Sequence, residues 1–219
     1  MLHLVTFKSK NLTCERFILG SLQVNTYLVY ETGSDKALII DPAEESPTLL
    51  NRVIELGFNE TTIFLTHGHA DHLAGVEYFR TRLSGCRVAI SQEDAPMLGD
   101  PDLNLSSYIG DSIALKDAEI ILKDKDVFGP GGEIVSVPGH TPGGLILVFP
   151  GMVFSGDTLF AGSIGRSDFP GGDGRQLIKA IKDKIFTLSD RYVFPGHGPE
   201  TRIAEEQAEN PFFSDSFTV

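Results

Sequence analysis

Residues 66–72 read Thr66-His67-Gly68-His69-Ala70-Asp71-His72, which places three histidines and one aspartate within six residues. The stretch has no apolar periodicity, so packing in a hydrophobic core explains it poorly. Imidazole nitrogens suit zinc, iron and copper, and a carboxylate adds a harder oxygen ligand. We therefore interpret this turn as a metal-binding segment.

Two more histidines each follow a Pro-Gly pair, in Pro138-Gly139-His140 and Pro195-Gly196-His197, whereas His3 stands apart and is taken as incidental. Each of these groups follows a predicted strand, where functional side chains concentrate on loops held by a rigid scaffold. Asp157 also follows a strand, in Ser155-Gly156-Asp157. A Gly-Asp pair after a strand is also a common turn, so Asp157 alone decides nothing.

Four ligands so close in sequence cannot all surround one ion comfortably. The natural division gives His67 and His69 to one metal, and Asp71 and His72 to a second. His140 and His197 would complete the two sites, one each, and the two oxygens of Asp157 could bridge the ions. Two metals about 3.5–4 Å apart are a known device for activating water. Asp71 and Asp157 are accordingly the expected catalytic carboxylates.

The hydrophobic pattern predicts strands in two groups, each followed by helices. The expected strands are Phe17–Gly20, Val24–Glu31, Lys36–Asp41, Thr61–Thr66, Arg87–Ser91, Glu133–Val137, Leu145–Pro150, Met152–Ser155 and Arg191–Phe194. The expected helices are Pro47–Leu56, Leu73–Leu83, Leu177–Ile185 and Ile203–Glu209. Residues 67–72 and 162–174 should be loops, and 94–111 a short helix with a mobile loop. We infer an α+β fold of two packed sheets with helices outside, forming one domain over residues 1–219.

The chain has 30 acidic and 18 basic residues, a formal net charge of −12, and two cysteines, Cys14 and Cys86. An acidic chain without clustered Lys and Arg is not expected to bind nucleic acid. No apolar run reaches the 18 residues of a membrane span, and residues 1–11 are too polar for a signal peptide. Two isolated cysteines suit a reducing compartment. We expect a cytoplasmic protein without a membrane or nucleic-acid partner, and the sequence leaves no trace of its oligomeric state.

The motifs at Thr66–His72, Pro138–Gly143, Ser155–Leu159 and Pro195–Pro199, in that order, resemble the metallo-β-lactamase superfamily. The resemblance runs over nearly the whole chain. It implies a four-layer αβ/βα sandwich with the metals at one edge of the sheets. It also implies two ligand sets, His67, His69 and His140 for one ion and Asp71, His72 and His197 for the other, with Asp157 bridging them.

Within that superfamily, the stretches Gly139–Gly143, Gly165–Gly172 and Pro195–Thr201 are similar to glyoxalase II, the hydroxyacylglutathione hydrolases. That likeness implies hydrolysis of a small-molecule thioester such as S-lactoylglutathione. A thiol of pKa about 8.5 is a good leaving group, so no dedicated acid is needed. The expected cofactors are two divalent ions, zinc first, with iron or manganese also compatible with the ligands.

Two departures from glyoxalase II concern the substrate. The sequence ends at residue 219, too soon after His197 for the C-terminal helical domain that contacts glutathione, and the Tyr that follows the last ligand in Gly-His-Glu-Tyr is replaced in His197-Gly198-Pro199-Glu200. Arg166 is the expected contact for a substrate carboxylate, although it could instead pair with Asp168 or Asp173. Asn104 and Tyr108 are weaker substrate-binding candidates, in a 102–110 segment that could cover the site.

Several other functions remain open. A persulfide dioxygenase shares the first motif but uses one iron, at positions corresponding to His67, His140 and Asp157. A β-lactamase and a lactonase use the same fold. A non-catalytic metal-binding module is a further possibility, although all seven ligand positions are filled.

Overall fold

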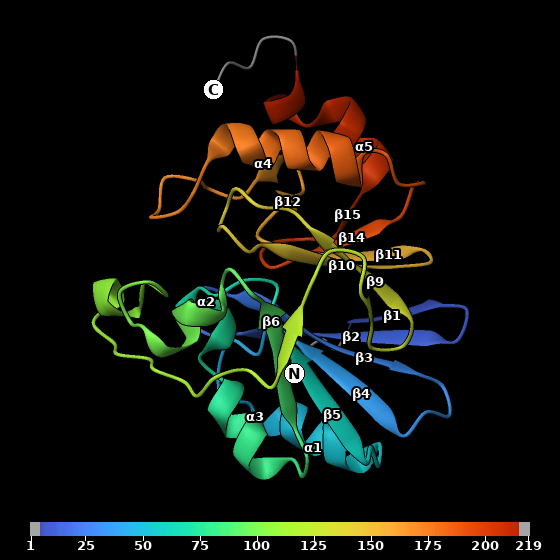
Figure 1. Cartoon of the computed structure of the whole chain (residues 1–219). Helices are drawn as coiled ribbons and strands as arrows, with labels where there is room; N and C mark the ends of the chain where they lie inside the picture. Colours follow the sequence, from blue (N-terminus) through green and yellow to red (C-terminus); the bar gives the residue numbers. More distant parts are fainter. Residues whose placement is uncertain (1–4, 215–219) are drawn as a thin grey trace.

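The computed structural model describes residues 5–214, in which two β-sheets pack face to face (Figure 1). The first sheet has seven strands in the order β1 to β7. They are β1 (Val5–Ser9), β2 (Leu12–Leu19), β3 (Val24–Glu31), β4 (Lys36–Ile40), β5 (Glu60–Phe64), β6 (Arg87–Ser91) and β7 (Ile120–Leu122). Strands β1 to β4 pair antiparallel, and β4 to β7 pair parallel. The carboxyl ends of β4 and β5 therefore meet at one sheet edge.

The second sheet has six strands in the order β15-β14-β11-β10-β9-β8. They are β8 (Val127–Phe128), β9 (Gly132–Ser136), β10 (Leu145–Phe149), β11 (Met152–Gly156), β14 (Tyr192–Pro195) and β15 (Thr201–Arg202). A separate hairpin joins β12 (Leu159–Phe160) to β13 (Ser163–Ile164). Strands β11 and β14 run parallel, so their carboxyl ends also lie together.

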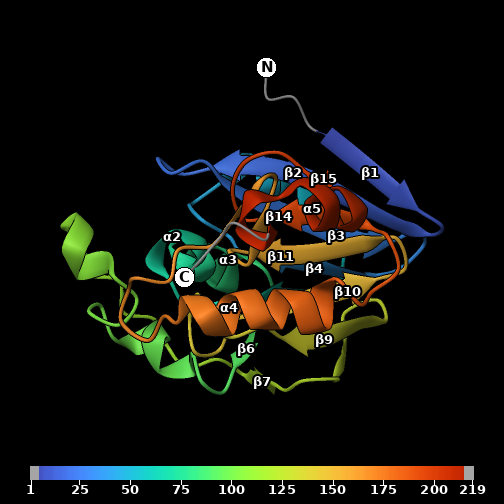
Figure 2. The same cartoon turned by 90° about the horizontal axis from the view of Figure 1, so that it is seen from above.

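Helices cover the outer face of each sheet (Figures 1 and 2). They are α1 (Pro47–Glu55), α2 (Ala70–Leu73), α3 (Val76–Arg82), α4 (Gly174–Ala180) and α5 (Ile203–Glu209), with a π-helical turn η3 (Ile181–Ile185) and short 3₁₀ turns η1 (Ala95–Gly99), η2 (Ser106–Ile109) and η4 (Pro211–Phe213). In Figure 1, α1 and α3 lie below the first sheet, and α4 and α5 lie above the second. The order is helix, sheet, sheet, helix, which confirms the predicted four-layer sandwich.

Three hydrophobic cores hold these layers together. The central core lies between the sheets and includes Tyr27, Phe64, Phe154 and Phe194, all nearly inaccessible to solvent. The second core joins the first sheet to α1 and α3, and the third joins the second sheet to α4, η3 and α5. Because β3, β4, β10 and β11 contribute to a core on each face, they contain nearly continuous apolar runs, as expected for buried strands.

The prediction of one continuous helix over Leu73–Leu83 is wrong. The structure has α2 and α3 instead, separated at Gly75. A Cβ atom at Gly75 would lie 2.4 Å from the carbonyl oxygen of Glu44, so the chain approaches the β4–α1 loop too closely there for a side chain. The predicted loop at 67–72 is also partly helical, because α2 begins at Ala70 and carries Asp71 and His72.

Sequence analysis missed β1, the Leu12–Arg16 part of β2 and several short strands. Strands β7, β8 and β15 have two or three residues each, and β13 lies inside the predicted loop 162–174. Segment 94–111 contains the two turns η1 and η2 rather than one short helix. His3 lies outside the described residues. Over residues 5–214, the structure has no helix long and apolar enough to cross a bilayer.

Candidate metal centre

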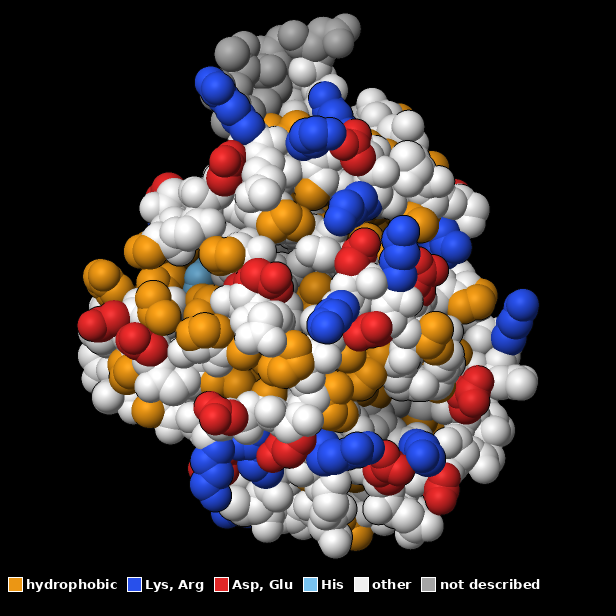
Figure 3. Space-filling view, in the orientation of Figure 1, with side chains coloured by type: hydrophobic (Ala, Val, Ile, Leu, Met, Phe, Trp, Pro, Cys, Tyr) orange, Lys and Arg blue, Asp and Glu red, His pale blue; other side chains and the backbone are white. Residues whose placement is uncertain are grey.

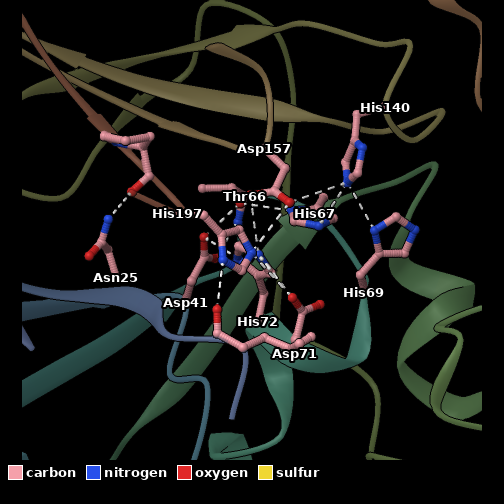
Figure 4. A network of polar contacts seen from close by, with 12 residues as sticks. Asn25, Asp41, Thr66, His67, His69, Asp71, His72, His140, Asp157 and His197 are labelled. Carbon is pink, nitrogen blue, oxygen red and sulfur yellow. Dashed lines mark hydrogen bonds and ion pairs between the residues drawn. The ribbon is translucent and has the colours of Figure 1, made fainter. Parts of the chain in front are cut away.

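The seven predicted ligands lie in the segments that follow four strands. His67 follows β5, His140 follows β9, Asp157 follows β11 and His197 follows β14, while α2 carries Asp71 and His72 and His69 precedes it. Their side chains converge at one edge of the two sheets (Figure 4). The structure therefore brings together all seven residues, which the sequence separates by up to 130 positions.

One group of ligand atoms consists of imidazole nitrogens. His140 Nε2 lies 3.3 Å from His67 Nε2 and 3.0 Å from His69 Nδ1. Nitrogens bound tetrahedrally to zinc at about 2.0–2.1 Å lie about 3.3 Å from one another. Both distances from His140 Nε2 thus suit neighbouring corners of a tetrahedral site, the three ligand atoms lie within 4.8 Å of one another, and all three residues are buried.

The second ring nitrogens of His67 and His140 fix how these two imidazoles are oriented. His67 Nδ1 lies 3.0 Å from the Thr66 hydroxyl, and His140 Nδ1 lies 2.6 Å from the carbonyl oxygen of Arg166. A carbonyl can only accept, so His140 donates from Nδ1 and keeps its Nε2 lone pair free to bind a cation. Such contacts are the usual means of orienting histidine ligands.

A second group consists of Asp71, His72 and His197. Asp71 Oδ2 lies 3.3 Å from His197 Nε2 and 3.7 Å from His72 Nε2. Asp157 lies between the two groups, with Oδ1 3.3 Å from His72 Nε2, and Oδ2 3.6 Å from His197 Nε2 and 3.8 Å from His140 Nε2. Asp157 is therefore the carboxylate placed to serve both groups.

Two facing atoms show that this arrangement fits a cation. His72 Nε2 and Asp157 Oδ1 are buried and form no hydrogen bond with any residue of 5–214. His72 Nδ1 lies 2.9 Å from Asp41 Oδ2, so a neutral His72 ring would carry its proton on that side and offer the Nε2 lone pair to a cation. Buried polar atoms without a hydrogen-bond partner are costly, and a cation bound by His72 Nε2 and Asp157 Oδ1 would give both atoms a partner.

The imidazoles fall into two kinds, those whose pKa is lowered and those whose pKa is raised. Burial, assisted by the neighbouring histidines, holds the pKa of His67 well below its usual range and lowers that of His69 to about 3. Burial also opposes protonation of His72, but Asp157, Asp71 and Asp41 raise its pKa well above the usual value. Burial works against ionisation of Asp71 and Asp157, yet His72 and His197 lower both pKa values. The carboxylates of Asp71 and Asp157 thus stay ionised, as a bound cation requires.

Asp41 supports the centre although sequence analysis did not select it. It directly follows β4 and has a left-handed φ of 49°, and its carboxylate faces Thr66 in the ligand loop. Oδ1 accepts from the Thr66 backbone N–H at 2.8 Å, and Oδ2 accepts from the Thr66 hydroxyl at 2.7 Å and from His72 Nδ1. The only available signal was an aspartate at the end of the predicted strand Lys36–Asp41.

Asp94 joins two ligand loops from a third direction, and it too was missed. Its fully buried carboxylate accepts hydrogen bonds from Gly68 N at 3.1 Å, Thr141 Oγ1 at 2.7 Å and Gly143 N at 2.7 Å. Burial raises the pKa of Asp94 while these three donors lower it. The residue therefore fixes the loop of His67 and His69 relative to the loop of His140.

The loop of His197 is fastened to β3. Asn25 Nδ2 donates to the carbonyl oxygens of Pro195 at 3.0 Å and Gly198 at 2.8 Å, and its backbone N–H donates to Gly196 at 2.7 Å. A Cβ at Gly196 would lie 2.4 Å from Asp157 Oδ1 and 2.6 Å from His72 Cε1. The Pro-Gly-His sequence thus leaves room for two other ligands.

The three predicted substrate contacts differ in their exposure and in their hydrogen bonds. Tyr108 is exposed and lines the cavity over the ligands. Asn104 also borders it but is fully buried, and its amide donates to Met97 and Ile113 carbonyls and accepts from Ser106 N–H. Asn104 therefore holds the 102–110 segment together. Arg166 pairs with Asp168 through both Nε and Nη2, at 2.8 and 2.7 Å. The ion pair with Asp168, which the sequence suggested as an alternative to a substrate contact, is therefore present in the structure.

Comparison with known proteins agrees with this geometry. A family model described as the metallo-beta-lactamase superfamily matches residues 19–197, which include all seven ligand positions. Hydroxyacylglutathione hydrolase GloC of Haemophilus influenzae is 35% identical over 207 residues, covering 89% of this chain and 94% of that protein. The crystal structure of the BLEG-1 B3 metallo-beta-lactamase matches with a TM-score of 0.86 and 34% identity, covering 92% of this chain and 99% of that one. The structure of TTHA1623 in a di-iron-bound form matches with a TM-score of 0.79 and 34% identity, over 90% and 98% of the two chains.

Proposed function

The chain belongs to the metallo-beta-lactamase superfamily, and on this premise we propose that it is a dinuclear metal-dependent thioester hydrolase of the glyoxalase II type. The observation that carries the proposal is the pair of ligand groups with Asp157 between them. Both groups are complete, as a two-metal hydrolytic site requires. The similarity to a hydroxyacylglutathione hydrolase supports a thioester as the substrate.

The side chains of this protein would divide the work as follows. His67, His69 and His140 would hold one ion, and Asp71, His72 and His197 the other, with Asp157 shared. When bound, the pair of ions would supply an activated water and positive charge beside the carbonyl oxygen under attack. Asp41 keeps the His72 lone pair on the metal side, and the Arg166 carbonyl does the same for His140. A thiol leaves readily at neutral pH, which explains why no further acid is needed.

We propose zinc as the physiological metal, with iron or manganese as the alternatives. The ligand set is five imidazoles and two carboxylates, which all three metals accept. A similar protein has been solved in a di-iron-bound form, which supports iron as the first alternative. Cys14 and Cys86 are free and buried, which fits a reducing compartment and our inference of a cytoplasmic enzyme.

Hydrolysis of β-lactams is a second candidate, favoured by the similarity to a B3 metallo-beta-lactamase. The persulfide dioxygenase alternative requires only one iron, whereas here the second group of Asp71, His72 and His197 is complete. The three activities are separated by direct assay. Zinc-loaded protein should hydrolyse S-lactoylglutathione or another thioester faster than nitrocefin, and iron-loaded protein should consume no oxygen with glutathione persulfide. Fast nitrocefin turnover without thioester hydrolysis would favour the lactamase, and oxygen uptake the dioxygenase.

A further inference from the structure

A cavity of about 640 Å³ opens directly over the ligands, and its walls are largely apolar. Carbon-rich side chains come from four separate segments: Leu22 after β2, Leu105, Tyr108 and Ile109 around η2, Phe160 and Ile164 in the β12–β13 hairpin, and Phe169 and Pro170 beyond it. Figure 3 shows hydrophobic side chains gathered on this side of the molecule, with a histidine visible among them. A cavity of this kind binds the apolar part of a ligand.

Aromatic rings border the ligands at both ends of the metal centre. The Phe169 ring packs edge-on to His69, with centroids 5.6 Å apart. The Phe160 ring packs in the same way against His197, at 6.3 Å. A substrate placed over the metals therefore meets hydrocarbon on either side rather than polar groups.

Charge in the cavity does not suit an anionic thiol such as glutathione. Among the described residues that line it, Arg166 is the only lysine or arginine. Its guanidinium is engaged by both oxygens of Asp168 and lies 4.0 Å above the Phe169 ring, so it completes the wall instead of offering an unpaired charge.

The η2 segment presents further apolar surface at the rim. Tyr108 and Ile109 are 73% and 66% exposed, unusually so for large hydrophobic side chains. The segment begins at Leu105 and ends at Gly110, both in left-handed conformation, and Asn104 anchors it from below. Its shape is thus fixed by buried hydrogen bonds, while its apolar side chains point outward beside the cavity mouth.

From these features we propose that the preferred substrate is a thioester with an uncharged apolar arm, namely a medium-chain or aromatic group, and that glutathione thioesters are poor substrates. The inference rests on the proposed thioester hydrolase function and specifies its substrate class. The apolar arm lies between the η2 segment and the β12–β13 hairpin, with the thioester carbonyl over the ligands.

Binding of thioethers tests the proposal, because a thioether resembles the thioester but cannot be hydrolysed. Calorimetry on zinc-loaded protein would compare S-propyl, S-hexyl and S-nonyl derivatives of N-acetylcysteamine, and S-hexylglutathione. Affinity should rise about two- to fourfold per added methylene, as expected for burial of hydrocarbon. The S-hexyl derivative of N-acetylcysteamine should bind more tightly than S-hexylglutathione, which carries two additional carboxylates.

Two matched substitutions at exposed apolar positions, Ile109 and Val127, test where the binding surface lies. Ile109→Asp should weaken binding of the S-nonyl compound at least about tenfold and leave the S-propyl compound nearly unchanged, since only the long chain reaches the rim. Val127→Asp is the control, because Val127 is 77% exposed on β8 and does not line this cavity. It should alter neither affinity. Circular dichroism of both variants checks that they fold.

The possible outcomes separate this inference from the function on which it rests. Affinity independent of chain length, tighter binding of S-hexylglutathione, or equal losses in the two variants would overturn the substrate class even if thioesters are hydrolysed. Chain-length-dependent binding without hydrolysis of any thioester would retain the apolar site and overturn the thioester hydrolase.

Discussion

At the scale of single residues, the candidate metal centre depends on two carboxylates that lie outside the predicted set of ligands. Asp41 is 1% exposed and contacts both Thr66 and His72, so one side chain orients the first ligand loop and fixes a tautomer. Asp94 performs a similar task between the loops of His67 and His140. Metal ligands in proteins usually require such partners, because an imidazole with the wrong nitrogen protonated cannot bind.

We predict that Asp41→Asn weakens metal binding about 10–100-fold. Asp41 Oδ1 accepts from the Thr66 backbone N–H, so the new amide nitrogen would face His72 Nδ1. The ring must then carry its proton on Nε2, which removes the lone pair needed by the cation. Competition with a chelating dye measures the affinity. Asp35→Asn, on an exposed turn, is the control, and equal affinities for the two variants would contradict the role assigned to Asp41.

A second prediction concerns Gly196. Gly196→Ala places a methyl group 2.4 Å from Asp157 Oδ1 and 2.6 Å from His72 Cε1, so at least one ligand must move. We expect loss of at least about half of the bound metal and a fall in kcat of about 10²-fold, since small displacements at an active site are costly. Elemental analysis and kinetics measure these effects. Gly99→Ala is the matched control because its nearest neighbour, the Leu115 carbonyl oxygen, is 3.8 Å away. Full metal content in Gly196→Ala would show that the site tolerates the methyl group.

At this scale the sequence indicated the candidate ligands but not the residues that hold those ligands in position. The seven candidate ligands could be selected because histidines cluster in residues 66–72 and recur after Pro-Gly pairs. Asp41 and Asp94 lie 25 and 49 residues from Thr66 and Gly143, the donors they bind. A lone aspartate at such a distance has no local pattern that distinguishes it from a surface acid. For Arg166 the sequence left two roles open; the side chain lines the cavity and pairs with Asp168, and a substrate contact stays a prediction.

At the scale of elements, the strands position the chemistry through their carboxyl ends. The apolar runs of β3, β4, β10 and β11 made these strands predictable. The edge strands β7, β8 and β15 were not predictable, because two or three residues carry no periodicity and are held by pairing with their neighbours. The break between α2 and α3 escaped prediction for a similar reason, since Gly75 is dictated by contact with a distant loop.

Helix α1 is tied to the first sheet by a largely buried ion pair. Arg52 on α1 binds both oxygens of Glu15 on β2, at 2.7 and 2.8 Å, and the Glu15 side chain is 2% exposed. The Tyr30 hydroxyl donates to the same carboxylate. Burial opposes ionisation of Glu15, but Arg52 and Tyr30 outweigh it and lower the pKa below the usual 4.5.

We therefore predict that Arg52→Met lowers the free energy of unfolding by about 2 kcal/mol at pH 7, because Glu15 keeps a buried charge without its cation. Stabilisation of the wild type by ionised Glu15 is fully present above pH 4.5, which is the pKa of this carboxyl in the unfolded chain, and is lost as the pH falls through the lower pKa of the folded protein. The difference in the free energy of unfolding between wild type and Arg52→Met should therefore be smaller below pH 4.5 than at pH 7.

Urea unfolding at pH 7 and pH 4 measures this difference. Lys179→Met removes an exposed helical ion pair with Asp183 and should change the free energy of unfolding very little. An equal effect of Arg52→Met at both pH values would contradict the assignment of the loss to the charge of Glu15.

At the scale of the whole molecule, the two halves meet at the metal centre. His67, His69, Asp71 and His72 belong to the half built on the first sheet, and His140, Asp157 and His197 to the half built on the second. The central core supplies the rigid contact between the sheets, so each half can position its ligands relative to the other. This organisation was predictable in outline from two groups of strands, each followed by helices. The sequence could not reveal the apolar cavity, because its walls come from four separate segments.

Metal content, measured with activity on the same sample, tests most directly whether these seven side chains hold two ions. Protein loaded with zinc, desalted and analysed by elemental mass spectrometry should contain two equivalents per chain. Removal by a chelator should abolish thioester hydrolysis and lower the melting temperature, since the ions bind the folded state, and added zinc should restore both. A metal-free protein that hydrolyses thioesters at the full rate, or a chain that retains no zinc, would contradict the assignment of a two-metal centre.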